Sequence, residues 1–142
     1  MTDASATPRK PYVPPADRTY SWRLPARPVR RIDADTFVVL VEMPVAIEIG
    51  PLNVKTTGKL PHEVILRLDG IDAWEDETAQ GKIAAEFVDT WMLSQDLFVL
   101  TSNFKRDRYH RVLGQLVAPQ LDGLDVVLAQ VLLDLGHARR WT

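Results

Sequence analysis

Short strand-like segments recur along the sequence, and a helical segment interrupts them after the third strand. Between residues 75 and 94, apolar residues such as Phe87 and Trp91 recur at helical spacing, which predicts a helix. A helix placed after the third of five short strands favours a small Greek-key barrel over a parallel sheet. The five strands are predicted at residues 29–32, 37–41, 62–72, 97–101 and 111–118.

The segments between and after these strands contain turn residues and a second helical pattern. Two aspartates in residues 33–36 mark a tight hairpin turn between the first two strands. Residues 44–61 contain several glycines and prolines and are expected to be irregular, with at most a short strand at 47–49. Residues 122–135 predict a second, mostly apolar helix that ends at Gly136.

The first 28 residues differ in composition from the rest of the chain. They hold six of the ten prolines, a spacing that prevents helix formation and favours extended, polyproline-like backbone. We therefore divide the sequence into a Pro-rich basic N-terminal arm, residues 1–28, and a folded domain, residues 29–142. Few contacts are expected between residues 1–24 and that domain.

Charge is distributed unevenly between these two parts. Residues 1–31 contain seven basic and two acidic side chains, a net charge of +5, whereas the whole chain has a net charge of −2. The remaining residues therefore carry −7. A basic arm on an acidic body favours a polyanionic partner or a protein partner with an acidic surface, although a solvated tail has the same composition.

The composition excludes several kinds of protein. The chain has no cysteine, so disulfides and thiolate metal sites are excluded. Its first residues lack the apolar core of a secretory signal, and no uncharged run reaches membrane-spanning length. We therefore expect a cytoplasmic location and no membrane partner.

The stretch from Arg67 to Glu75 combines a guanidinium and several carboxylates at the end of a predicted strand. Arginine presents a planar fork that matches phosphate oxygens, and the carboxylates of Asp72 and Glu75 suit a hard cation or a bound water. This combination indicates chemistry on a phosphate. A polar turn followed by an acidic helix start is the alternative interpretation.

A basic loop, residues 105–111, is predicted between the fourth and fifth strands. It contains four cationic side chains and one aromatic ring within seven residues. Such a loop suits contacts with phosphates and bases, although many basic loops are simply solvated. The chain therefore presents, in order, an aspartate hairpin, an arginine strand ending in carboxylates, a helix and a basic loop.

This order of motifs resembles the staphylococcal (micrococcal) nuclease family over about residues 29–138. Residues 32–36, Ile-Asp-Ala-Asp-Thr, are similar to the family's Ile-Asp-Gly-Asp-Thr. Residues 67–75, Arg-Leu-Asp-Gly-Ile-Asp-Ala-Trp-Glu, are similar to its Arg-Leu-x-x-Val-Asp-Thr-Pro-Glu. Residues 107–111, Asp-Arg-Tyr-His-Arg, are similar to the family's Asp-Lys-Tyr-Gly-Arg. Residues 81–84, Gly-Lys-Ile-Ala, are similar to its helix start Gly-x-x-Ala, and residues 132–138, Leu-Leu-Asp-Leu-Gly-His-Ala, to its closing Leu-Val-x-x-Gly-x-Ala.

The resemblance implies a five-stranded OB-type barrel with helices, and calcium-dependent cleavage of DNA and RNA phosphodiesters. The family's metal-binding positions correspond to Asp35, Asp72 and the backbone carbonyl of Ala73 in this sequence. Asp33 is expected to contact these ligands without binding the cation itself. The expected cofactor is Ca²⁺, with Mg²⁺ or Mn²⁺ as alternatives.

The same match assigns the catalytic and nucleic-acid-binding residues. Glu75 corresponds to the residue that activates or orients the attacking water. Arg67 and Arg111 correspond to the pair that grips the cleaved phosphate while charge builds on it. Arg108 and Tyr109 correspond to groups near the terminal phosphate of a bound nucleotide. Lys105 and His110, which belong to the same basic loop, are further expected contacts with nucleic acid, expected to be single-stranded DNA or RNA.

Three substitutions depart from the family pattern. Trp74 replaces a proline just before Glu75 and affects how that carboxylate is presented. Ala34 replaces a glycine in the hairpin turn, which matters only if that position needs a positive φ. His110 replaces a glycine beside Arg111 and adds a titratable ring.

The sequence thus predicts an α+β, staphylococcal-nuclease-like barrel with two helices and a Pro-rich arm, acting as a metal-dependent nuclease. The alternative is a nuclease-like barrel that serves as a structural or binding module, anchored by its arm in a larger assembly such as a phage particle. The basic arm and the acidic body favour the module. The complete set of charged site residues favours the nuclease: Asp35, Arg67, Asp72, Glu75 and Arg111.

Overall fold

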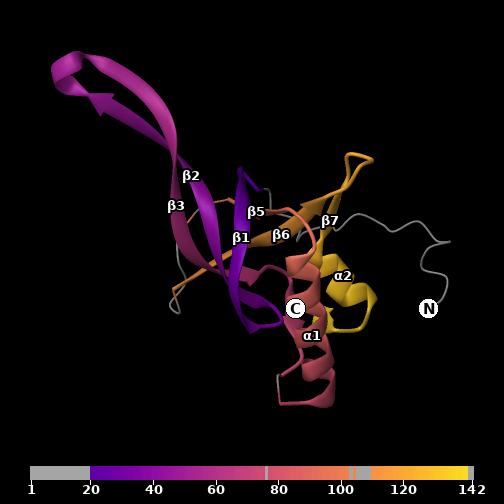
Figure 1. The fold of residues 1–142 in the computed structure, drawn as a ribbon. Coiled ribbons are helices and arrows are strands. Elements are labelled where there is room, and N and C mark those ends of the chain that lie inside the picture. The colour runs from indigo at the N-terminus through magenta and orange to yellow at the C-terminus, as the bar shows by residue number, and fades with distance from the viewer. Residues whose placement is uncertain (1–19, 76, 103, 105–109, 141–142) are drawn as a thin grey trace.

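The computed structural model describes residues 20–140 apart from 76, 103 and 105–109. These residues form a closed five-stranded mixed barrel with two helices, which confirms the predicted α+β class and is consistent with an OB-type fold (Figure 1). The barrel strands are β1 (Trp22–Asp33), β2 (Thr36–Ile49), β3 (Val54–Leu68), β5 (Leu97–Thr101) and β6 (Arg111–Pro119). The short strands are β7 (Asp125–Val127), which extends the sheet beyond β6, and the separate pair β4 (Ile71–Ala73) and β8 (Ala138–Arg140).

The barrel closes where β6 pairs with β3. Residues 111–114 of β6 run parallel to residues 65–68 of β3, whereas the other barrel strands pair in antiparallel fashion. β6 also lies very close to β5 at Gly114, so a Cβ atom there would collide with the carbonyl oxygen of Leu100. Glycine is required at this position since the two backbones leave no room for a side chain.

β1 starts at Trp22, ahead of the domain boundary predicted at residue 29. Its first part pairs with β5 and its second part with β2, and the exchange of partners occurs at Ala26. Pro28 lies where the register with β2 shifts, and a bulge of this kind tolerates a residue without a backbone N–H. β1 therefore includes residues 22–28 of the predicted arm, because prolines fit such strand positions. Residues 1–19 of the predicted arm lie outside the described residues.

The prediction that residues 1–24 make few contacts with the barrel is wrong for the part that the structure describes. The Tyr20 hydroxyl donates to Asp69 Oδ2 over 3.3 Å and accepts from Gln115 Nε2 over 3.3 Å. Asp69 and Gln115 are both buried, so the hydroxyl offsets part of their loss of water. These contacts fix the chain just before β1.

β2 and β3 form a long hairpin that projects away from the barrel (Figure 1). The strands pair without interruption down to Ile49 opposite Val54, and the 3-10 turn η2 (Gly50–Leu52) joins them. The prediction that residues 44–61 are irregular is therefore wrong. The distal part of this hairpin consists of only two strands, so the outer edge of each strand pairs with no other described strand. Prolines do not break the hairpin because such an edge tolerates a residue that has no N–H to donate.

The two helices are α1 (Ala79–Leu93) and α2 (Leu128–Asp134). α1 starts later than the predicted residue 75 because the Thr78 side chain caps its first turn. α2 is shorter than the predicted span of 122–135, since the β-branched residues Val126 and Val127 extend as β7 along β6. No helix among the described residues is both long and apolar enough to cross a membrane.

The core fills the barrel and the space between the barrel and the helices. Phe37, Leu66 and Leu116 are fully buried barrel residues, and Val88 of α1 and Leu132 of α2 belong to the same cluster. Burying a side chain of this kind contributes roughly 1.5–3 kcal/mol relative to leaving it exposed. This continuous core fixes the strand ends that carry the polar residues of the site.

Candidate active site

Seven residues singled out from the sequence line one pocket of about 230 Å³. They come from four separated segments, namely the β1–β2 turn, the end of β3, β4 with the loop after it, and the start of β6. Thr36 and Trp74 complete the lining. The seven residues are Asp33, Asp35, Arg67, Asp72, Ala73, Glu75 and Arg111.

The strand register explains why these segments meet. Thr36 at the start of β2 pairs with Arg67 near the end of β3. Arg111 begins β6 beside Ile65 of β3. β4 follows β3 after a turn in which Gly70 has a φ of 87°, a conformation that favours glycine. One end of the barrel therefore carries the side chains of all four segments.

Arg67 is the buried cation of the pocket, with 6% of its surface exposed. Its Nη1 atom donates to the Leu68 carbonyl oxygen over 2.7 Å and lies 3.3 Å from Asp35 Oδ2. Its Nη2 atom lies 3.7 Å from Asp72 Oδ1. A buried guanidinium needs such partners because an unpaired charge in the protein interior is costly. These contacts hold the fork of Arg67 in one orientation.

Asp35 is also buried, and both of its carboxylate oxygens accept hydrogen bonds. Thr36 Oγ1 donates to Oδ1 and the Ala73 N–H donates to Oδ2, each over 2.9 Å. Together with the ion pair to Arg67, these donors fix the direction of the carboxylate. The bond from Ala73 also ties β4 to the start of β2.

Asp72 is more accessible and lies between two arginines. Its side chain is 39% exposed, with Oδ1 facing Arg67 and Oδ2 accepting from Arg139 Nη2 over 3.2 Å. Arg139 reaches Asp72 because β8 pairs with β4 and places the two residues opposite each other. The sequence motifs do not point to Arg139, since the pairing joins residues 67 positions apart.

The oxygen atoms of the pocket suit a hard cation such as Ca²⁺. Asp35 and Asp72 contact the same guanidinium and line the same pocket, so their carboxylates face one small volume. Ca²⁺ takes about six to eight oxygen ligands, so two carboxylates would need the Ala73 carbonyl, water or substrate oxygens beside them. Across the described part of the chain, no group of three or more acidic, histidine or cysteine side chains is arranged to hold a metal. A cation bound here would share both carboxylates with Arg67.

The loop that carries Glu75 is anchored on both sides. Glu75 is exposed, and its carbonyl oxygen accepts from the Thr78 N–H over 3.0 Å and from the Thr78 hydroxyl over 2.8 Å. On the other side, the Trp74 indole N–H donates to the Gly136 carbonyl oxygen over 2.9 Å. The Arg139 guanidinium also lies 5.3 Å from the centroid of the Trp74 ring. Trp74 therefore supports the loop through contacts, at the position where the resembled family has a proline.

The turn between α2 and β8 fixes the position of Arg139. Gly136 has a φ of 76°, and the His137 N–H donates to the Leu132 carbonyl oxygen over 2.8 Å, which ends α2. The His137 ring packs against Phe87 with centroids 5.3 Å apart. Burial lowers the pKa of His137 below its usual 6.5, because it disfavours the charged ring.

The structure describes only part of the predicted nucleic-acid contacts. Lys105, Arg108 and Tyr109 lie outside the described residues. His110 is exposed and has a left-handed φ of 63°, which histidine adopts more readily than most residues other than glycine. Ala34, in contrast, is not among the described residues with a positive φ, so its turn does not need glycine.

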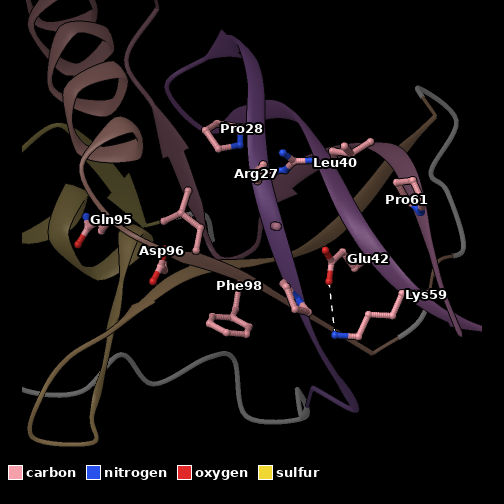
Figure 2. Close-up of a pocket in the computed structure, with 12 residues that line it drawn as sticks. Arg27, Pro28, Leu40, Glu42, Lys59, Pro61, Gln95, Asp96 and Phe98 are labelled. Carbon is pink, nitrogen blue, oxygen red and sulfur yellow. Dashed lines mark ion pairs between the residues drawn. The ribbon is translucent and has the colours of Figure 1, made fainter.

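A larger pocket of about 420 Å³ lies at the base of the β2–β3 hairpin (Figure 2). Two basic side chains, Arg27 and Lys59, and two acidic ones, Glu42 and Asp96, line this pocket. Lys59 Nζ lies 3.6 Å from Glu42 Oε2 (Figure 2). The charges of this larger pocket balance, and none of the predicted site residues line it. The pocket of about 230 Å³ is therefore the better candidate for an active site.

In comparisons with known proteins, no protein-family model and no curated protein matched the chain. The function is therefore inferred from the groups that meet in the smaller pocket. These are two guanidiniums and four carboxylates, gathered around one small volume at one end of the barrel.

Proposed function

We propose that this protein is a nuclease that hydrolyses phosphodiester bonds of DNA, RNA or both, built on a staphylococcal-nuclease-like Greek-key barrel. One observation carries the proposal: a single pocket collects two arginines, Glu75 and the carboxylates of Asp35 and Asp72 from separated segments. Arginine forks match phosphate oxygens, and carboxylates bind cations or orient water. A barrel that only bound nucleic acid would have no use for the carboxylates, since they repel phosphate.

In this proposal, Arg67 and Arg111 bind the non-bridging oxygens of the cleaved phosphate. Charge on these oxygens grows as the attacking water approaches phosphorus, so fixed cations stabilise the transition state more than the ground state. Arg67 suits this role because its contacts with Leu68 and Asp35 hold the fork in place before substrate binds. Arg111 enters the same pocket from the neighbouring strand β6.

Glu75 orients the attacking water and accepts its proton. Its side chain is exposed on the loop between β4 and α1, so water reaches it from solvent. The backbone contacts with Thr78 and the anchoring of Trp74 limit the movement of this loop. A carboxylate at a restricted position can accept a hydrogen bond from water and take the proton as the new P–O bond forms. The bond between phosphorus and the leaving sugar oxygen breaks as this bond forms, and the leaving oxygen takes up a proton from water.

Asp35, Asp72 and the Ala73 carbonyl would hold a cation, with Asp33 in the same pocket. The chemistry that such a cation supplies when bound is polarisation of the phosphate and compensation of negative charge. The lining residues include four carboxylates and two guanidiniums, a formal charge of −2. This charge supports a divalent cation, Ca²⁺ first, with Mg²⁺ and Mn²⁺ as alternatives.

The test is cleavage of a labelled single-stranded DNA by the purified protein, with Ca²⁺ or with a chelator. We expect cleavage with Ca²⁺, loss of cleavage with chelator, and a rate roughly 10²–10⁴-fold lower for Glu75→Gln. Glu75 is exposed, so this substitution should leave the melting temperature unchanged. The matched control is Glu77→Gln, which removes the same charge from an exposed position nearby and should stay active.

A wild-type protein that cleaves neither DNA nor RNA with Ca²⁺, Mg²⁺ or Mn²⁺ would refute this proposal. Cleavage that is equally reduced in Glu75→Gln and Glu77→Gln would refute the role given to Glu75. The first result would leave the second candidate function, a structural or binding module anchored by the N-terminal arm in a larger assembly such as a phage particle.

The projecting β2–β3 hairpin is the observation that favours such a module. Directly opposed residues of an antiparallel pair share a face, and one face of the distal hairpin is apolar. Its pairs are Met43 with Leu60, Val45 with Gly58, Ile47 with Thr56, and Ile49 with Val54. Ile47, Ile49, Val54 and Leu60 are 40–57% exposed, and a two-stranded ribbon gains stability when such a face is covered. The module predicts that the protein forms oligomers through this face and that Ile47→Ser disperses them, which light scattering would measure. This result, together with no cleavage of nucleic acid by the wild-type protein, would favour the module over the nuclease.

A further inference from the structure

We infer that Arg139 is a displaceable counter-ion of Asp72 that couples nucleic-acid binding to cation binding. The guanidinium occupies the carboxylate until a phosphate of the bound strand takes it over, and Asp72 then becomes available to the cation. This inference rests on the proposed function, because it concerns the same pocket. Its distinguishing claim is that one exposed arginine makes the two ligands bind cooperatively.

The backbone places Arg139 beside Asp72. In the antiparallel pair of β4 and β8, Asp72 lies directly opposite Arg139, so both side chains project from the same face. Arg139 Nη2 donates to Asp72 Oδ2 over 3.2 Å, while Arg67 Nη2 lies 3.7 Å from Asp72 Oδ1. The two oxygens of this carboxylate are therefore divided between two arginines.

The two arginines differ in how firmly they are held. The Arg67 side chain is 7% exposed and also contacts Asp35 and the Leu68 carbonyl, so it is a fixed part of the pocket. The Arg139 side chain is 63% exposed. Ion pairs between groups as accessible as Arg139 and Asp72 are weak, because water and salt screen them. Arg139 is therefore the arginine that a ligand can displace from Asp72.

Trp74 keeps the displaced guanidinium near the pocket. Its indole is fixed by the hydrogen bond to Gly136, and the Arg139 guanidinium already lies 5.3 Å from the ring centroid. A guanidinium over an aromatic face is favourable even without the ion pair. Arg139 can thus leave Asp72, remain over Trp74 and present its remaining N–H donors to a phosphate of the strand.

Cooperativity follows from competition for the same groups. A cation that binds alone must displace Arg139 from Asp72, whereas a cation that binds after nucleic acid meets a carboxylate already released. By thermodynamic linkage, the cation then strengthens nucleic-acid binding by the same factor. The factor should be modest, roughly 2–5-fold, because the exposed ion pair that is exchanged is weak.

The experiment is calorimetric titration with Ca²⁺, with and without a single-stranded phosphorothioate oligonucleotide that resists cleavage. For the wild-type protein we expect the oligonucleotide to raise Ca²⁺ affinity roughly 2–5-fold. Arg139→Ala should bind Ca²⁺ more tightly than wild type without oligonucleotide, and the oligonucleotide should raise its Ca²⁺ affinity by a smaller factor than in wild type. The matched control is Arg140→Ala, which removes the same charge from the next residue of β8, on the opposite face.

A second variant protects the test against misfolding. Arg139→Lys keeps the charge next to Asp72 but loses the bidentate fork. It should bind Ca²⁺ alone as wild type does, yet show a smaller increase with oligonucleotide. Circular dichroism melts identify any variant that does not fold, in which case the other variant decides.

Each outcome bears on a different claim. If the wild-type protein binds Ca²⁺ and cleaves DNA, but Arg139→Ala matches Arg140→Ala in affinity and in the oligonucleotide effect, the inference fails and the proposed function stands. If wild type neither binds Ca²⁺ nor cleaves nucleic acid, both fail. A larger oligonucleotide effect in Arg139→Ala or Arg139→Lys than in wild type would also overturn the inference.

Discussion

Asp35→Asn is expected to destabilise the fold as well as to weaken cation binding. Asp35 and Arg67 are each 6% exposed, and their charged atoms lie 3.3 Å apart. Removing one partner of a buried ion pair costs about 3–5 kcal/mol, because the other charge loses its compensation. Arg67 keeps the Leu68 carbonyl at 2.7 Å and Asp72 at 3.7 Å, which reduces the loss. We therefore expect a loss of roughly 3 kcal/mol in the free energy of unfolding, the lower end of the range for buried pairs.

Urea unfolding followed by circular dichroism measures this loss. The double variant Asp35→Asn with Arg67→Met leaves no uncompensated buried cation, so it should be less destabilised than the two single variants predict together, by roughly 1–3 kcal/mol. Asp33→Asn is the control: Asp33 is an exposed residue of the same pocket, and its replacement should change stability by less than about 0.5 kcal/mol. An Asp35→Asn protein as stable as wild type would refute the reasoning, and so would strictly additive losses in the double variant.

Three further substitutions test the catalytic site, the barrel closure and a partly buried histidine. Arg111→Lys should lower the single-turnover cleavage rate roughly 10²–10³-fold while oligonucleotide affinity, measured by anisotropy, changes little; equal small losses in both would favour a binding module. Gly114→Ala should lower the free energy of unfolding by roughly 1–3 kcal/mol, because its Cβ would meet the Leu100 carbonyl. Gly50→Ala meets no atom within 4 Å and should be neutral in the same urea assay. Burial lowers the folded-state pKa of His137 below 6.5, so the unfolded state binds a proton at a higher pH than the folded state does. The free energy of unfolding therefore falls as the pH falls below about 6.5. His137→Gln should remove that part of the pH dependence of the urea midpoint, and an unchanged pH profile would contradict it.

The barrel strands are more predictable from sequence than the segments that join them. The strands predicted at 97–101 and 111–118 are confirmed as β5 and β6, because short segments rich in apolar and β-branched residues between polar segments favour strands. The β2–β3 hairpin escapes prediction, since glycine and proline within residues 44–61 are typical of irregular loops. The hairpin forms because these residues pair with one neighbour only, a condition that depends on where β1 and β6 end.

The site is predictable to the extent that its residues lie at strand ends. Asp35 and Arg67 follow from local motifs, and the register of β2 with β3 brings them together. Arg139 cannot be found in this way, because its place beside Asp72 depends on the pairing of β4 with β8, which joins segments far apart in the sequence. Nor does a local pattern predict Trp74 as the platform beside Arg139, since that contact requires the turn at Gly136.

The pairing of charges within the site bears on how an acidic protein would bind a polyanion. The residues after 31 carry a net charge of −7, so the body of the protein repels nucleic acid at long range. Arg67 inside the pocket and Arg139 beside it compensate Asp35 and Asp72, so a phosphate or a cation would meet groups that are already paired. In the proposed mechanism, a divalent cation on Asp72 would release the donors of Arg139 for phosphate, and a phosphate on Arg139 would release the carboxylate of Asp72 for the cation. Each ligand therefore removes the obstacle to the other, and a site of this kind needs no strongly basic surface to bind a nucleic acid when the cation is present.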